Sequence, residues 1–320
     1  MIRTYSHWPR DLYNSCPPKR LASPLHACIN SAVRAQFPRW YRTMKNADTV
    51  RLDFDLYEPN KPSIIKSPII IMHGLFGSKK NNRTISKVYS KELGRPIYSI
   101  DLRNHGKSPH RRKFDYLTMA ADVVKFIKDH NLEQPTLIGH SMGAKVAMTL
   151  ALLKPESFRD IISVDNAPIQ SSLPHDFKRY IEGMQQVELM KATKNSEADK
   201  ILQHYVESYP VRQFLLANAY RTKSNSMKFQ IPLETLAYSL PNLGDFPFKQ
   251  PTKSRFNRPA LIVRGTKSDY VPDECFPVIE RLFPRYSSTD IEAGHWLISE
   301  NPDAFLKATI DFLMPREQSL

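Results

Sequence analysis

Cysteine is rare in this chain of 320 residues, which contains only Cys16, Cys28 and Cys275. An odd number of cysteines without metal-ligand spacing argues against a disulfide framework and against a zinc site. The sequence also has no apolar stretch near the roughly 18 to 20 residues that a transmembrane helix needs. These shortages predict a soluble protein from a reducing compartment, with no membrane span.

Acidic residues are outnumbered, and the formal net charge is +14. Half of this excess lies in residues 1–47, which contain eight lysines and arginines against one acid, Asp11. A basic chain can bind nucleic acid, but here the basic residues form no stripe with interleaved aromatics, and no recognition helix or zinc pattern is present. We therefore expect no nucleic-acid partner.

Residues 1–47 are also rich in serine and proline and have no uninterrupted apolar core, so they do not resemble a secretory signal. A mitochondrial leader is the better interpretation of this basic segment, and an unstructured basic tail is the alternative. The sequence thus predicts a mitochondrial protein whose leader is removed or disordered.

Five continuously apolar runs predict parallel strands that are covered on both faces, and residues 50–57 alternate as an edge strand does. Helical patterns separate most of them. The sequence therefore predicts an α/β fold with a mostly parallel sheet and helices on both faces. The apolar runs are residues 68–72, 96–100, 136–138, 161–164 and 260–263, and the helical patterns are residues 117–130, 142–153, 273–283 and 303–313.

The alternation of strands and helices stops between residues 168 and 256. This interval has helical stretches at 177–191 and 198–216, followed by chain punctuated by prolines. Because it is too long for a bare loop, we interpret it as an inserted helical cap over the carboxyl edge of the sheet. The expected core is then residues 48–167 and 257–316.

The sequence Gly139-His-Ser-Met-Gly143 follows an apolar run and precedes a stretch of helix formers. A serine between glycines at a strand-to-helix turn is typical of the nucleophile elbow of α/β-hydrolases. Side chains two positions from the serine would collide with the neighbouring strand and helix, and glycine removes that collision. We therefore predict that Ser141 is a nucleophile rather than a helix cap.

A serine nucleophile needs a base, and the base needs an orienting carboxylate. His295 lies in a glycine-containing loop after the last expected strand, where this fold places its general base. Two acids follow adjacent strands, Asp165 and Asp269. We favour Asp165, because the position three residues after Gly265 that often supplies the acid is Ser268 here.

Backbone amides that stabilise an oxyanion are expected at Leu75 and Met142, with Phe76 a further candidate donor. We expect His73 to brace its loop. Arg103 and His105 follow another strand and either contact substrate or, as we favour, fasten loops. No phosphate-binding loop is present, and Asp53 and Asp55 are too few for a metal site, so neither metal nor cofactor is expected.

Six segments together resemble one branch of the α/β-hydrolases, the one that contains the mitochondrial α/β-hydrolase domain-containing protein eleven and yeast ethanol acetyltransferases. The resemblance covers about residues 50 to 315. It implies an acid from the Asp-Asn-Ala-Pro segment, which supports Asp165. The six segments are residues 73–79, 101–106, 139–145, 164–168, 211–216 and 294–296.

The resemblance implies a serine hydrolase or acyltransferase that acts on small esters or thioesters. One alternative is an alcohol acetyltransferase that makes ethyl acetate from acetyl-CoA and ethanol. Another is a non-catalytic binding protein in a mitochondrial assembly, because function does not follow from fold. Cap residues Phe214, Leu215, Leu216 and Phe246 either line an acyl pocket or form the core of the cap. The sequence leaves the oligomeric state open.

Overall fold

The computed structural model describes residues 48–65, 67–171, 176–249 and 252–314. The predicted leader, residues 1–47, lies outside the described residues, and so do Cys16 and Cys28. Cys275 is free and buried. None of the helices in the described ranges has the length and apolar character needed to span a membrane.

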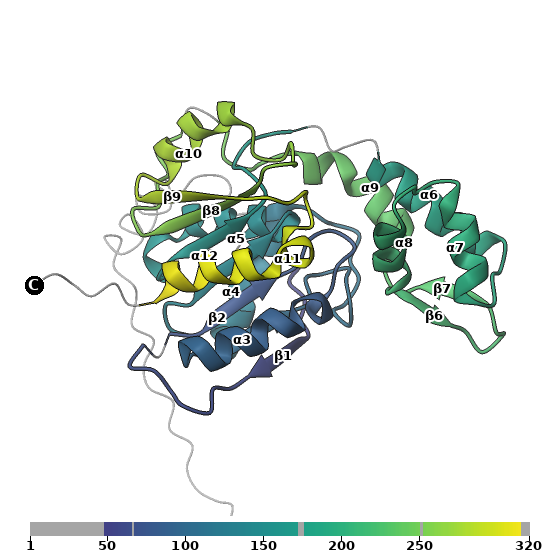
Figure 1. Cartoon of the computed structure of the whole chain (residues 1–320), viewed down its shortest axis with the longest axis horizontal. Coiled ribbons are helices and arrows are strands. Elements are labelled where there is room, and N and C mark those ends of the chain that lie inside the picture. The colour runs from purple at the N-terminus through teal and green to yellow at the C-terminus, as the bar shows by residue number, and fades with distance from the viewer. Residues whose placement is uncertain (1–47, 66, 172–175, 250–251, 315–320) are drawn as a thin grey trace, which may run out of the picture. The chain divides into compact units, whose positions relative to one another are not determined.

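One seven-stranded sheet forms the centre of the described chain (Figure 1). All neighbouring strands pair in parallel except the first two in the order, which are antiparallel. The mostly parallel sheet predicted from the apolar runs is confirmed. The order is β1 (Phe54–Tyr57), β3 (Ile97–Ile100), β2 (Ile69–Met72), β4 (Thr136–His140), β5 (Ile161–Val164), β8 (Ala260–Gly265) and β9 (Tyr286–Ile291).

Helices cover both faces of this sheet, with α3 and α12 on one face and α4 and α5 on the other (Figure 1). The predicted helices agree with α4, α5 and α12 to within a residue, and 273–283 is a short 3-10 turn, Asp273–Cys275, followed by α10. The bounds are α3 (Arg83–Leu93), α4 (Tyr116–Asp129), α5 (Met142–Leu153), α10 (Phe276–Leu282), α11 (Leu297–Glu300) and α12 (Pro302–Leu313). Two further 3-10 turns span Lys79–Asn82 and Pro155–Ser157.

Helix α3 was not predicted, although its buried residues Ile85, Tyr89 and Leu93 recur every four positions, which marks one face of a helix. These three residues pack in a cluster with Ile69 of β2 and Phe305 of α12. Because successive side chains of a strand point to opposite faces, the apolar runs supply both layers of the core.

The chain between β5 and β8 carries helices and one small hairpin. Four helices are described here: α6 (Asp176–Leu189), α7 (Asn195–Gln203), α8 (Tyr209–Leu216) and α9 (Leu233–Gly244). The prediction of one helical stretch over 198–216 is wrong, because Pro210 lies in the first turn of α8 and lacks the amide that a continuing helix needs. The unpredicted hairpin is β6 (Ala219–Arg221) with β7 (Met227–Phe229).

The C-terminal end of α9 is fastened to the core. The Tyr116 hydroxyl donates to the Leu243 carbonyl at 2.7 Å, and Lys145 Nζ donates to the carbonyls of Gly244 and Asp245 at 3.2 Å each. The last carbonyls of a helix have no partner within the helix and favour a nearby cation. Burial lowers the pKa of Lys145 to about 8.

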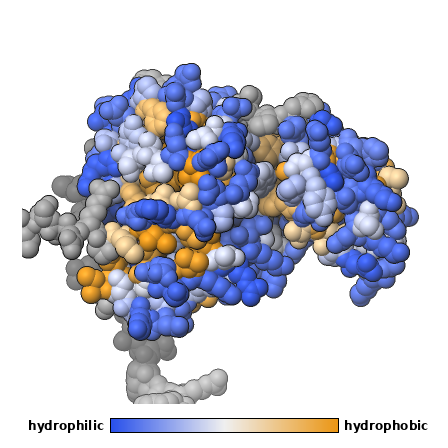
Figure 2. All heavy atoms as spheres, viewed as in Figure 1, coloured by the Kyte–Doolittle hydropathy of each residue, from blue (hydrophilic) through white to orange (hydrophobic). Residues whose placement is uncertain are grey.

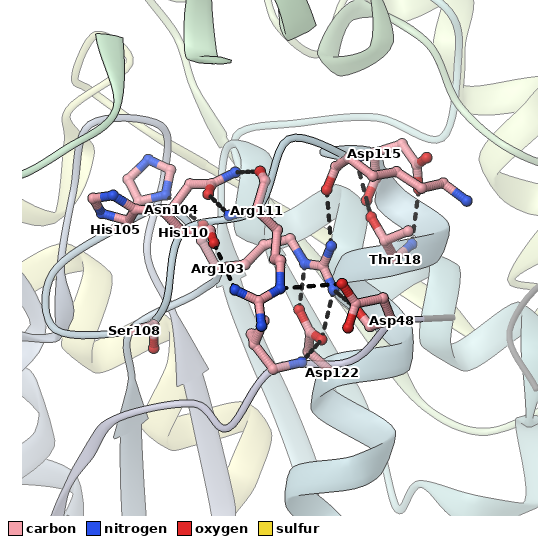
Figure 3. A network of polar contacts seen from close by, with 12 residues as sticks. Asp48, Arg103, Asn104, His105, Ser108, His110, Arg111, Asp115, Thr118 and Asp122 are labelled. Carbon is pink, nitrogen blue, oxygen red and sulfur yellow. Dashed lines mark hydrogen bonds and ion pairs between the residues drawn. The ribbon is translucent and has the colours of Figure 1, made fainter. Parts of the chain in front are cut away.

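A buried ion pair fastens the start of the described chain to α4 (Figure 3). Arg103 donates to both carboxylate oxygens of Asp122, at 2.5 and 2.7 Å, and to the Asp48 and Lys113 carbonyls. Asp122 also accepts from the Val50 amide at 2.8 Å. Leaving either charge unpaired would be strongly unfavourable at this depth, so Arg103 has a structural role.

Apolar side chains are scattered over the surface that Figure 2 shows, and most of that face is hydrophilic. Among the described residues, Ile64 and Tyr238 are the most exposed large apolar side chains, at 91% and 72%. Scattered apolar residues of this kind are ordinary on a protein surface.

Candidate active site

The turn between β4 and α5 holds Ser141 in a strained conformation. Its φ is 53° and its ψ is −113°, and α5 begins at the next residue. A Cβ at Gly139 would overlap the Gly143 carbonyl, and a Cβ at Gly143 would overlap the Met72 carbonyl of β2. Glycine is therefore required at both positions, as the sequence predicted.

Three side chains from separate loops meet at the carboxyl edge of the sheet. His295 Nε2 lies 2.9 Å from Ser141 Oγ, and its Nδ1 lies 2.7 Å from Asp165 Oδ2. Ser141 follows β4, Asp165 follows β5, and His295 follows β9. The structure thus brings together the three residues that the sequence nominated.

Asp165 is completely buried, and other groups hold its carboxylate in place. Its Oδ1 accepts from the Gly265 amide at 3.0 Å, and its Oδ2 accepts from the Ser268 hydroxyl at 2.5 Å. Asp269, the other candidate acid, is exposed, and within the described residues it forms no bond to His295. Ser268 was not predicted to take part, although its position three residues after Gly265 was the available signal.

The imidazole of His295 is held by its neighbours as well as by Asp165. The Tyr270 ring stacks on it, with centroids 3.8 Å apart and planes 16° apart. Burial lowers the pKa of His140 to about 4, and its neutral ring donates from Nε2 to the His295 carbonyl at 2.8 Å. These contacts limit rotation of the proposed base, and sequence patterns gave no sign of the Tyr270 stack.

The loop after β2 presents the Leu75 amide. The carbonyl of the same peptide, Gly74 O, accepts from the Gly77 amide at 3.0 Å and from His73 Nδ1 at 2.8 Å. Because the amide of a trans peptide points opposite to its carbonyl, these two bonds fix the direction of the Leu75 amide. His73 accepts at Nε2 from the Leu102 amide, so its ring is neutral, and burial lowers its pKa to about 4.

The Leu75 and Met142 amides have no protein acceptor within the described ranges. Met142 is the first residue of α5, where a helix leaves its amides free. The Phe76 amide was considered as a third donor, but it already donates to His105 Nε2 at 3.1 Å. His105 in turn donates from Nδ1 to the Arg103 carbonyl at 3.0 Å, so it fastens loops rather than contacting substrate.

A cavity of about 750 Å³ lies beside the turn that carries Ser141. Gly74 and His140 line it; Gly74 packs against Ser141, and His140 precedes Ser141 in the sequence. Phe214 of α8 and Trp296 line it, with ring centroids 4.5 Å apart. Leu215, Leu216 and Phe246, the other residues considered for an acyl pocket, are buried and do not line this cavity. Pockets of this size accommodate ligands larger than an acetyl group.

The acidic residues considered as metal ligands are paired instead. Lys79 Nζ lies 2.5 Å from Asp53 and 3.0 Å from Asp55. In the part of the chain that the structure describes, no three histidine, cysteine or acidic side chains gather as metal ligands do.

Residues 67–302 match the family model of the alpha/beta hydrolase fold. The chain therefore belongs to the α/β-hydrolase family. It is 38% identical to a probable alcohol acetyltransferase of Saccharomyces cerevisiae, over 79% of this chain and 78% of the relative. It is 36% identical to the sn-1-specific diacylglycerol lipase ABHD11 of Xenopus laevis, over 85% of this chain and 87% of the relative.

Among solved structures, a marine microorganism esterase aligns with a TM-score of 0.76 and 31% identity, over 82% of this chain and all of the esterase. These similarities confirm the branch that the six motifs predicted. They support an enzyme of the hydrolase or acyltransferase type.

Replacing Tyr270 should reveal how much the stacked ring contributes to the reactivity of Ser141. Such aromatic contacts contribute about 0.5 to 1.5 kcal/mol, so Tyr270→Leu should slow labelling of Ser141 by a fluorophosphonate probe roughly 2- to 13-fold. Tyr270→Phe keeps the ring and should react like the unchanged protein. Equal slowing in both variants would instead implicate the hydroxyl.

The buried neutral histidines should make stability fall in mild acid. Burial lowers the pKa of His105 to about 3, whereas an unfolded histidine titrates near 6.5. Below pH 6.5 the unfolded chain therefore binds a proton that the folded chain does not, and the free energy of unfolding decreases by up to about 1.4 kcal/mol per pH unit.

Urea unfolding between pH 6 and pH 5 measures this slope. His105→Gln should make it shallower, whereas His204→Gln, at an exposed position, should leave it unchanged. A slope that is the same in all three proteins would contradict the role of His105 burial.

Proposed function

We propose that this chain hydrolyses small esters or thioesters through an acyl-serine intermediate. The observation that carries the proposal is the unbroken hydrogen-bonded series from Asp165 through His295 to Ser141. The cavity beside Ser141 supplies space for a substrate. Relatives named as a lipase and an esterase support the same reaction.

In the proposed reaction, Ser141 Oγ bonds to the substrate carbonyl carbon while its proton passes to His295 Nε2. Asp165 accepts from Nδ1 of His295, which fixes the tautomer and stabilises the imidazolium. The amides of Leu75 and Met142 stabilise the negative oxygen. When the carbon–oxygen or carbon–sulfur bond breaks, the leaving alcohol or thiol takes the proton from His295.

The acyl group then passes from Ser141 to an acceptor, and Ser141 Oγ regains its proton from His295. Water gives hydrolysis, and an alcohol gives a new ester, with His295 again taking the proton of the attacking group. Alcohol acetyl transfer from acetyl-CoA to ethanol is the second candidate function, because relatives are named as alcohol and ethanol acetyltransferases. A non-catalytic binding role is the third, and it requires that Ser141 be unreactive.

Removing members of the proposed triad should separate their roles. Ser141→Ala should lower kcat for p-nitrophenyl acetate on the order of 10⁶-fold, and Asp165→Asn on the order of 10⁴-fold. Asp269→Asn is the matched control and should keep nearly full activity, because Asp269 is exposed and does not contact His295. Greater loss in Asp269→Asn than in Asp165→Asn would show that the acid is assigned wrongly.

Fluorophosphonate labelling tests catalysis itself, because the probe reacts with an activated serine. The unchanged protein should be labelled at Ser141, and Ser141→Ala should not be. A folded, unlabelled protein would favour the binding role.

The two acceptors can be compared in one experiment. Incubation with acetyl-CoA and increasing ethanol, with ethyl acetate and free acetate both measured, shows how the acyl-serine partitions. As a hydrolase, the protein should release mainly acetate, and ethyl acetate should stay a minor product. Ethyl acetate that dominates at high ethanol would establish the transferase instead.

We also propose that the protein is mitochondrial, on the basic composition of residues 1–47. A fluorescent reporter fused to these residues should enter mitochondria in living cells. A diffuse cytosolic signal would contradict the leader and support a basic tail.

A further inference from the structure

Asn218 connects the chain between β5 and β8 to the loop that presents the Leu75 amide. It follows α8 and is only 9% exposed. Its Nδ2 donates to the Phe76 carbonyl at 2.7 Å, across 142 positions of sequence. Its own backbone is fixed on both sides, because its amide donates to the Leu215 carbonyl at 3.0 Å and its carbonyl accepts from the Gln230 amide at 2.9 Å.

Phe76 is the strained residue of that loop. Its φ is 62°, in the left-handed region, which is unfavourable for a residue with a side chain. Such a conformation persists only where the surroundings hold it. Here the core holds the Phe76 amide through His105, while Asn218 holds the carbonyl and the Phe177 ring of α6 lies 5.9 Å from the Phe76 ring.

The Leu75 amide, the proposed oxyanion donor, belongs to the peptide immediately before the Leu75–Phe76 peptide. Donors aimed at an oxyanion act only in a narrow geometry, about 2.7 to 3.1 Å from the developing charge. The Phe76 carbonyl and the Gly77 amide belong to one peptide, and that amide donates to Gly74 O of the peptide that carries the Leu75 amide. A rotation of the Phe76–Gly77 peptide would therefore break one of the two bonds that fix the direction of the Leu75 amide.

We propose that Asn218 is a positioning residue for the oxyanion hole. Its hydrogen bond to the Phe76 carbonyl holds the strained loop in the conformation that aims the Leu75 amide at the reacting carbonyl. The helices α6 and α8 thereby become part of the catalytic apparatus, and full transition-state stabilisation requires that they be seated on the loop. This inference rests on the proposed serine hydrolase function.

The test compares two substitutions at Asn218 with a control elsewhere. Asn218→Ala removes the donor, and Asn218→Asp places a negative charge against the Phe76 carbonyl. Asn242→Ala is the control, because Asn242 of α9 is exposed and also donates from Nδ2 to a core carbonyl, that of Phe114 at 3.4 Å, which does not belong to the loop after β2. Thermal unfolding of each variant shows whether it folds.

The affinities for a trifluoromethyl ketone and for the carboxylate product distinguish a loss of oxyanion positioning from a general loosening of the site. A trifluoromethyl ketone forms a tetrahedral oxyanion on Ser141, whereas the carboxylate product does not. We expect Asn218→Ala to lower kcat/KM about 10- to 100-fold and to lower the affinity for the ketone by the same factor. The affinity of Asn218→Ala for the carboxylate product should stay within roughly twofold of that of the unchanged protein. Asn218→Asp should lose more kcat/KM than Asn218→Ala, and the kcat/KM of Asn242→Ala should change little.

The inference is overturned if Asn218→Ala loses no more activity than Asn242→Ala, or if ketone and product affinities fall equally. Failure of the proposed function has a different signature. In that case the unchanged protein is not labelled by fluorophosphonate and does not bind the ketone.

Discussion

The close approach of the β4–α5 turn to β2 is the constraint on which the site depends. A Cβ at Gly143 would overlap the Met72 carbonyl of β2, and a Cβ at Gly139 would overlap the Gly143 carbonyl within the turn itself, so no side chain fits at either position. The same turn places Ser141 at φ 53° and leaves the first amides of α5 free. Because β4 lies between β2 and β5, the loop after β2 that presents the Leu75 amide and Asp165 after β5 flank the serine from either side.

Strain gathers around this turn. Phe76, Ser141 and Asp165 all have a positive φ, and each lies in the segment that follows a strand of the sheet. Buried neutral histidines hold the surrounding loops, since His73 and His105 both donate and accept backbone hydrogen bonds. His295 differs from His73 and His105 because its partners are a carboxylate and a hydroxyl. Of these three histidines, His295 alone is therefore placed to take a proton from Ser141.

Much of the core could be predicted because its signals are local. Apolar runs and helical spacing located six of the seven strands and most of the core helices, and short motifs located Ser141 and His295. The interruption at Pro210 and the β6–β7 hairpin were missed. In that region the short elements pack against one another, β7 on α6 and α8 on α7, and tertiary contacts override weak propensities.

The class of fold and the residue types of the site could be predicted from the sequence, because the glycine spacing at a strained turn and the order of serine, acid and histidine are properties of the linear chain. The folded structure was needed to show that Asp165 rather than Asp269 contacts His295, that the Ser268 hydroxyl donates to the Asp165 carboxylate, and that Tyr270 stacks on the proposed base. Such contacts join residues from different strands and loops, and their distances depend on how the sheet and its loops pack.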